Sequence, residues 1–80
     1  MKNYVVGILS MYENELRLFK ISAENEYEAV KKGMIEFSSN EETKQDELTF
    51  QGTDEYPKDI KGLHSLYEEI PFSVIEVKSF

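Results

Sequence analysis

The stretch Tyr4-Val5-Val6-Gly7-Ile8-Leu9 decides the fold. β-Branched and aromatic residues favour strands, so we expect residues 3–11 to form the first strand. Alternation along this strand places apolar side chains on both faces: Tyr4, Val6 and Ile8 on one, and Val5, Leu9 and Met11 on the other. A strand that is apolar on both faces is typical of the centre of a sheet. Gly7 in its middle indicates a bulge or a close backbone approach.

A turn and a second strand follow the first strand. The segment Tyr12-Glu13-Asn14-Glu15 contains Asn14, which tolerates the left-handed conformation of tight hairpins. Residues 15–22 would then return as the second strand. Its apolar positions change phase between Leu18 and Phe19, which indicates either a bulge or partial cover on both faces.

Residues 25–38 are expected to form a helix. Asn25 is a favourable N-cap with Glu28 three residues later, as in a capping box. Helical spacing joins four apolar residues in one stripe, made of Tyr27, Val30, Met34 and Phe37. Glu28 and Lys32 have the spacing of an ion pair. Gly33 would allow the helix to pack closely against the sheet.

The second half of the chain gives weaker signals. Residues 38–47 hold no apolar residue and predict a loop, and residues 48–50 predict a short third strand. Pro57 suits the first turn of a second helix over residues 57–69. Residues 72–78 predict the last strand, with Phe72, Val74 and Glu76 on one face and Ser73, Ile75 and Val77 on the other.

The predicted fold class is therefore α+β. We expect a three- or four-stranded antiparallel or mixed sheet with one or two helices packed on one face. The 80 residues form a single domain, 1–80, with an acidic loop at about 38–47. A chain of this length supports one core and a free energy of unfolding of about 4–12 kcal/mol.

Composition restricts the chemistry. The chain has no cysteine, which excludes disulfides, a thiolate nucleophile and a cysteine-ligated zinc site. It also has no run of the roughly 20 apolar residues that a membrane span needs. The missing cysteines favour a cytoplasmic protein, and we expect no membrane partner.

The net charge of −7 is unevenly distributed. Residues 1–37 carry five basic and six acidic groups, whereas residues 38–80 carry four basic and ten acidic groups. Such a surface repels phosphate backbones, which disfavours direct binding of nucleic acid, and attracts basic proteins. Solubility alone is the other explanation for the acidity.

His64, the only histidine, is the one candidate general base, with Ser65, Asp59 or Glu68 as assisting groups. Ser65 is adjacent in sequence and would point elsewhere on a helix. The explanation we prefer for His64 is a partly exposed helix histidine without a chemical duty. We therefore predict no catalytic residue, no cofactor and no enzymatic activity.

The acidic stretch of the second half has three explanations: a solvated surface, a docking surface for a basic partner, or a calcium site. Its spacing does not match an EF-hand loop, so we predict no metal site. Tyr12, Tyr56 and Tyr67 lie near turns and would either cover the rim of the core or join a contact surface. The predicted partner-binding residues are Glu41, Glu42, Asp46, Glu47, Asp54, Glu55, Tyr56 and Asp59.

In its hairpin-then-helix opening from Val5 to Phe37, its length, its lack of cysteine and its acidic second half, the chain resembles small acidic accessory proteins of bacteriophages and mobile elements. The resemblance holds at the level of a class, without a diagnostic motif. It implies inhibition of another protein by occupation of its surface.

Together these features predict a non-enzymatic protein-binding module. A phage-type inhibitor that docks an acidic surface on a basic, nucleic-acid-binding protein fits this description. The alternative is a structural or self-associating protein, such as a homodimer, that pairs through the edges of its sheet.

Overall fold

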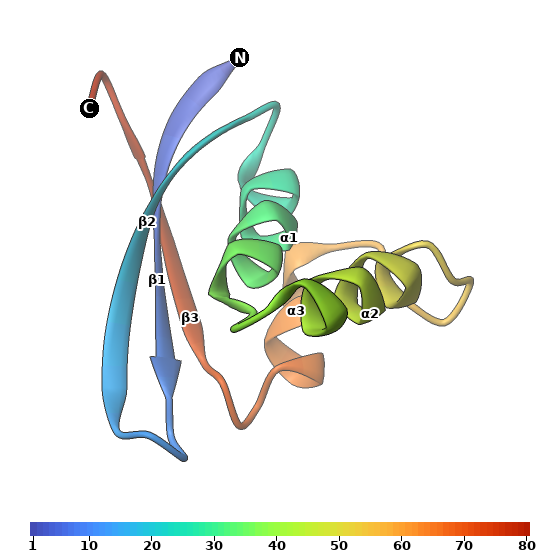
Figure 1. Ribbon diagram of the computed structural model, residues 1–80. Coiled ribbons are helices and arrows are strands. Elements are labelled where there is room, and N and C mark those ends of the chain that lie inside the picture. Colours follow the sequence, from blue (N-terminus) through green and yellow to red (C-terminus); the bar gives the residue numbers. More distant parts are fainter.

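A computed structural model describes all residues 1–80 and contains one three-stranded antiparallel sheet and three helices. The central strand is β1 (Lys2–Ser10), flanked by β2 (Glu15–Ala23) and β3 (Phe72–Val77). The predicted α+β class and the central position of the first strand are confirmed. All helices lie on the same side of the sheet (Figure 1).

The β1–β2 hairpin is regular. Asn14 in its turn has a φ of 53°, the left-handed conformation expected of it. The register runs without a break from Lys2 opposite Ala23 to Ser10 opposite Glu15, so neither strand contains a bulge. The apolar positions of β2 change phase because Phe19 faces the helices and the core, whereas Leu18 faces the opposite side of the sheet.

The helix α1 (Glu26–Phe37) follows β2 and begins as predicted. The Oδ1 atom of its N-cap, Asn25, accepts a hydrogen bond from the Glu28 N–H at 2.9 Å. A Cβ atom at Gly33 would lie 2.9 Å from Cγ1 of Val6 on β1, which confirms that this glycine permits close packing.

The predicted Glu28–Lys32 ion pair does not form. Glu28 instead lies 3.7 Å from the Lys31 ammonium, and Lys32 donates to the Ser22 carbonyl at 2.8 Å. The reason is that Lys32 reaches a backbone acceptor at the end of β2.

The predicted loop at 38–47 and strand at 48–50 are wrong, because a helix, α2 (Glu41–Gln51), occupies this segment. Asn40 and Thr43 form a capping box in which each side chain accepts from the other residue's N–H, at 2.9 and 3.2 Å. No residue of α2 is fully buried, and Phe50 is its main contact with the core. A helix with so little apolar surface lacks the periodic stripe from which helices are predicted.

The predicted helix at 57–69 is shorter than expected. The helix α3 spans Ile60–Leu66, and its N-cap, Asp59, accepts from the Gly62 N–H at 2.8 Å. Pro57 precedes the helix instead of occupying its first turn. The last strand, β3, confirms the prediction for residues 72–78 to within one residue.

The core lies between the helices and one face of the sheet. The helix α1 packs across all three strands, and α2 packs on α1. The buried apolar residues come from every element except α2, and they are Tyr4, Val6, Ile8, Ile21, Ala23, Ala29, Val30, Met34, Tyr56, Leu63, Tyr67 and Phe72. The opposite face of the sheet has no helix over it (Figure 1).

Candidate functional site

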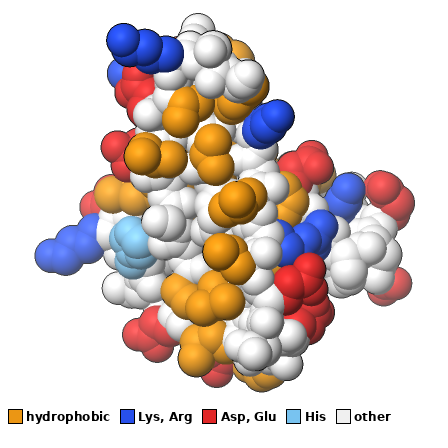
Figure 2. All heavy atoms as spheres, turned by 90° about the vertical axis from the view of Figure 1, so that its left-hand side faces the viewer, with side chains coloured by type: hydrophobic (Ala, Val, Ile, Leu, Met, Phe, Trp, Pro, Cys, Tyr) orange, Lys and Arg blue, Asp and Glu red, His pale blue; other side chains and the backbone are white.

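The uncovered face of the sheet is the main candidate site, and we call it the open face. Strand alternation and register define its members: Asn3, Val5, Gly7 and Leu9 of β1, Leu16, Leu18, Lys20 and Ser22 of β2, and Ser73, Ile75 and Val77 of β3. Figure 2 views the molecule from this side, and apolar side chains run along the length of the face. The open face thus consists mostly of apolar and small residues, with Asn3 and Lys20 among them.

The large apolar side chains of the open face are in contact with solvent. Leu18 is 67% exposed, Leu16 64%, Ile75 63% and Leu9 37%. Antiparallel sheets with one solvated face normally carry polar residues there. Exposed apolar patches are found at protein, ligand and membrane contact sites, which makes this face a candidate site.

A groove of about 380 Å³ crosses the open face. Its floor is formed by Gly7 and by Ser73, its partner on β3, because neither residue carries a large side chain. Leu18 leans over this floor, since a Cβ atom at Gly7 would lie 3.2 Å from its Cδ2. Val5 and Leu9 rise from β1 on either side of Gly7. The groove is of a size to accept apolar side chains from a partner.

The open face carries no carboxylate, although the chain has sixteen acidic residues. Its one charged member is Lys20 on the edge strand β2. Arg17 belongs to the helix side, where its guanidinium lies 5.2 Å from the Phe19 ring and donates to the Phe37 carbonyl at 3.2 Å. Glu76 also points to the helix side, 3.9 Å from the Lys2 ammonium. The chemistry of the open face is therefore apolar contact with little electrostatic steering.

The predicted partner-binding residues divide into two groups. Six of them are exposed and take part in no ion pair: Glu41, Glu42, Asp46, Asp54, Glu55 and Asp59. They lie on α2 and on the segment that leads to α3, away from the open face. The other two, Glu47 and Tyr56, belong to an internal network.

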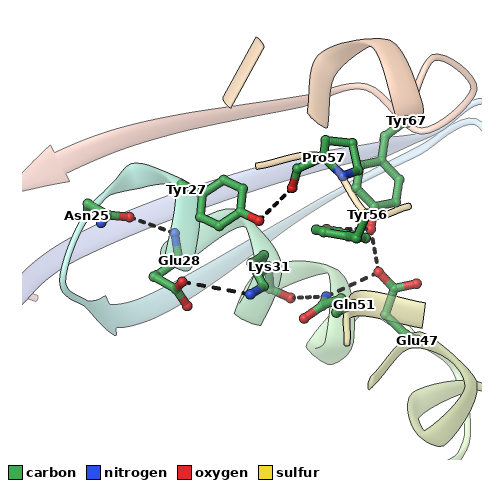
Figure 3. Close-up of polar contacts among 9 residues, drawn as sticks. All are labelled: Asn25, Tyr27, Glu28, Lys31, Glu47, Gln51, Tyr56, Pro57 and Tyr67. Atoms are coloured by element: carbon green, nitrogen blue, oxygen red, sulfur yellow. Dashed lines mark hydrogen bonds and ion pairs between the residues drawn. The ribbon is translucent and has the colours of Figure 1, made fainter. Parts of the chain in front are cut away.

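That network joins α1, α2, the segment before α3 and the end of α3 (Figure 3). The hydroxyl groups of Tyr56 and Tyr67 are 2.9 Å apart, and the Tyr67 hydroxyl donates to Glu47. Gln51 donates to the Glu47 carboxylate at 3.2 Å and to the Lys31 carbonyl at 2.9 Å. Tyr56 is only 1% exposed, so its ring is not available to a partner. Glu47 and Tyr56 therefore hold α2 against α1 and the core.

The phenol groups of this network are held in the neutral state. Burial raises the pKa of Tyr56 from 10.0 to about 12. Burial and the hydrogen bond to Glu47 raise the pKa of Tyr67 further above its usual range. A neutral Tyr67 can donate to the Glu47 carboxylate, which suits a structural contact.

Tyr12 differs from the two buried tyrosines. It is 78% exposed on the hairpin turn, and its hydroxyl donates to Glu69, which raises its pKa above the usual range. This contact ties the hairpin turn to the segment that follows α3.

His64 packs on an aromatic ring. Its imidazole stacks on Phe72 with centroids 4.1 Å apart and the two planes 12° apart. Its side chain makes no hydrogen bond with Asp59, Ser65 or Glu68, and Asp59 is occupied as the N-cap of α3. This geometry gives His64 a packing role and assembles no acid–base pair around it.

No group of three or more His, Asp or Glu side chains is placed to hold a metal ion. None of the three helices combines the length and the apolar character needed to cross a membrane.

No protein-family model matches the sequence, and neither a curated protein nor a solved structure matches the chain.

Proposed function

We propose that the chain is a non-enzymatic protein-binding module whose contact surface is the open face of its sheet. The single observation that supports this proposal is the exposure of Leu16, Leu18 and Ile75 together on a face without a carboxylate. Interfaces typically place apolar residues at their centre and deplete it of charge.

The energetics favour occupation of this face. Full burial of a Leu or Ile side chain stabilises an assembly by about 1.5–3 kcal/mol. Leu16, Leu18 and Ile75 each keep more than 60% of their surface exposed. Covering them would contribute about 3–6 kcal/mol before the cost of association, so the rest of the interface must supply most of the roughly 8 kcal/mol net that a micromolar complex needs.

The test places a photoactivatable amino acid at Leu18 on the open face and, in a matched variant, at Leu48 on α2. Leu48 is also a large exposed leucine, at 49%. Illumination in cells should give covalent protein adducts from position 18 and few from position 48. The absence of adducts at position 18, or equal adducts at both, would contradict the proposal.

A second candidate is docking of the acidic helix surface on a basic partner. It is favoured by the six exposed carboxylates that have no ion-pair partner, three of them on α2: Glu41, Glu42 and Asp46. Unpaired charges of one sign steer the encounter with a surface of opposite sign.

This second candidate is tested with the triple variant Glu41→Gln, Glu42→Gln, Asp46→Asn. Glu47 is left unchanged because Tyr67 and Gln51 donate to it. Binding to a basic probe such as cytochrome c should weaken about tenfold in the variant and should also weaken with added salt. Equal binding by the parent chain and the variant would exclude this surface.

A further inference from the structure

We infer that the open face docks on the same face of a second copy of this chain, forming a twofold dimer with the two sheets face to face. The inference rests on the proposed function, since it names the partner of the open face. It differs from pairing of sheet edges, in which the open faces would stay exposed.

Charge restricts where a second copy can dock. Each chain carries a net charge of −7, so two copies repel one another over most of their surface. The open face is where they can meet without bringing carboxylates together, because all sixteen acidic residues lie outside it. A basic partner, by contrast, finds no acidic group on this face to pair with.

Lys20 does not prevent this contact. It stands on β2, which is an edge strand, beside Val5 of the central strand. A lysine in that position can lay its apolar stem along the interface and extend its ammonium group to solvent at the rim.

The open face combines a groove with protruding leucines. A groove over Gly7 and Ser73 lies beside a ridge made by the paired residues Leu9 and Leu16. Packed sheets stand about 10 Å apart and interdigitate their inner side chains. The ridge of one copy can therefore enter the groove of the other in a twofold arrangement.

The surface area is also that of a chain with one uncovered layer. The accessible surface is 5493 Å², whereas a folded monomer of 9.3 kDa exposes about 5,000 Å². The chain thus exposes about a tenth more surface than an average monomer of its mass, as expected of a sheet with one uncovered face. Homodimer interfaces are moreover the most apolar class, which matches the composition of the open face.

The experiment measures the dissociation constant by sedimentation equilibrium from micromolar to millimolar concentration. The parent chain should approach twice its 9.3 kDa monomer mass. Leu18→Lys and Ile75→Lys should each weaken the dimer about 100-fold, because a charge replaces a central apolar contact. Leu48→Lys makes the same chemical change on α2 and should leave the dimer unchanged.

Two controls keep the test decisive. Far-ultraviolet circular dichroism should show that each lysine variant is folded, since both side chains are largely exposed in the monomer. Where a lysine variant does not fold, Leu18→Ser and Ile75→Thr replace it. Added salt should strengthen the dimer by screening the repulsion between two acidic chains.

The inference is overturned by a chain that stays monomeric at millimolar concentration. It is also overturned by a dimer that Leu18→Lys and Ile75→Lys leave intact, as edge pairing would give, or by a dimer that salt weakens. If the chain is monomeric but position 18 still gives photoadducts with other proteins, the dimer is excluded and the proposed protein-binding function stands.

Discussion

Both faces of the sheet are apolar, but one is buried under the helices and the other is exposed to solvent. On the covered face Val6 and Ile8 are 0% exposed, whereas on the open face Leu18 and Ile75 are 67% and 63% exposed. The residues are of the same chemical kind and come from the same strands or their neighbours. Apolar character therefore does not separate the residues that stabilise this fold from those available to a partner.

The difference arises from the placement of the helices. The helix α1 packs across the three strands, and α2 packs on α1 instead of on the sheet. The helical segments thus add thickness on one side, and no segment of residues 1–80 remains to cover the other side. The covered face should govern folding, and the open face should govern association.

The largest expected effect is a difference in stability between alanine variants of two isoleucines, Ile8 and Ile75. Ile8→Ala on the covered face should lower the free energy of unfolding by about 2–5 kcal/mol, because it leaves a cavity in the core. Ile75→Ala on the open face should lower the free energy of unfolding of the monomer by less than about 1 kcal/mol. Urea denaturation at a concentration where the chain is monomeric provides the measurement. Equal losses would show that the open face is buried in the folded monomer.

Alkaline pH should act on the covered side of the sheet through the two buried tyrosines, Tyr56 and Tyr67. The raised pKa values of Tyr56 and Tyr67 stabilise the folded chain below pH 10, and this contribution is lost as the pH rises through 10 toward 12 and above. After allowance for partial solvent screening, we expect Tyr56 to account for about 1–2 kcal/mol.

Unfolding curves recorded across this pH range, with phenolate absorbance as a second signal, would measure the loss. Tyr56→Phe and Tyr67→Phe should flatten the pH dependence, whereas Tyr4→Phe is the control. A pH dependence that is undiminished in the double variant would exclude the two phenols as its source.

The smallest expected effect is a difference in stability between alanine variants of two glycines, Gly33 and Gly7. Gly33→Ala brings a Cβ atom to 2.9 Å from the stiff side chain of Val6 on the covered face, and this clash should outweigh the gain in helix propensity by about 1 kcal/mol. Gly7→Ala meets only the flexible end of Leu18 at 3.2 Å, so its effect on unfolding should be within about 0.5 kcal/mol. Thermal denaturation of the two variants side by side tests the comparison. A more harmful Gly7→Ala would mean that Leu18 is held in place.

The first half of the chain could be predicted because its signals are local. The hairpin is set by Asn14 and two apolar strands, and α1 is set by Asn25 and a stripe at helical spacing. The segment of α2 lacks such a stripe, and its capping box of Asn40 with Thr43 is a weaker signal than the charges that surround it. Its predicted loop and strand were wrong for that reason.

The candidate site could be predicted only in part. The exposure of Glu41, Glu42 and Asp46 follows from their charge. The burial of Tyr56 does not, because it depends on partners that are distant in sequence, Tyr67 and Glu47. The open face was visible in the alternation of β1 as a second apolar side, but the alternation does not say which side the helices cover.

The sequence by itself determined the α+β class, the central position of β1 and the negative charge, because these depend on residue type and on neighbours along the chain. The tertiary structure alone decided which apolar face stays in solvent and which polar residues enter the interior. The physical reason is that burial is set by contacts between segments far apart in the chain, and a periodic pattern records only that a face is apolar.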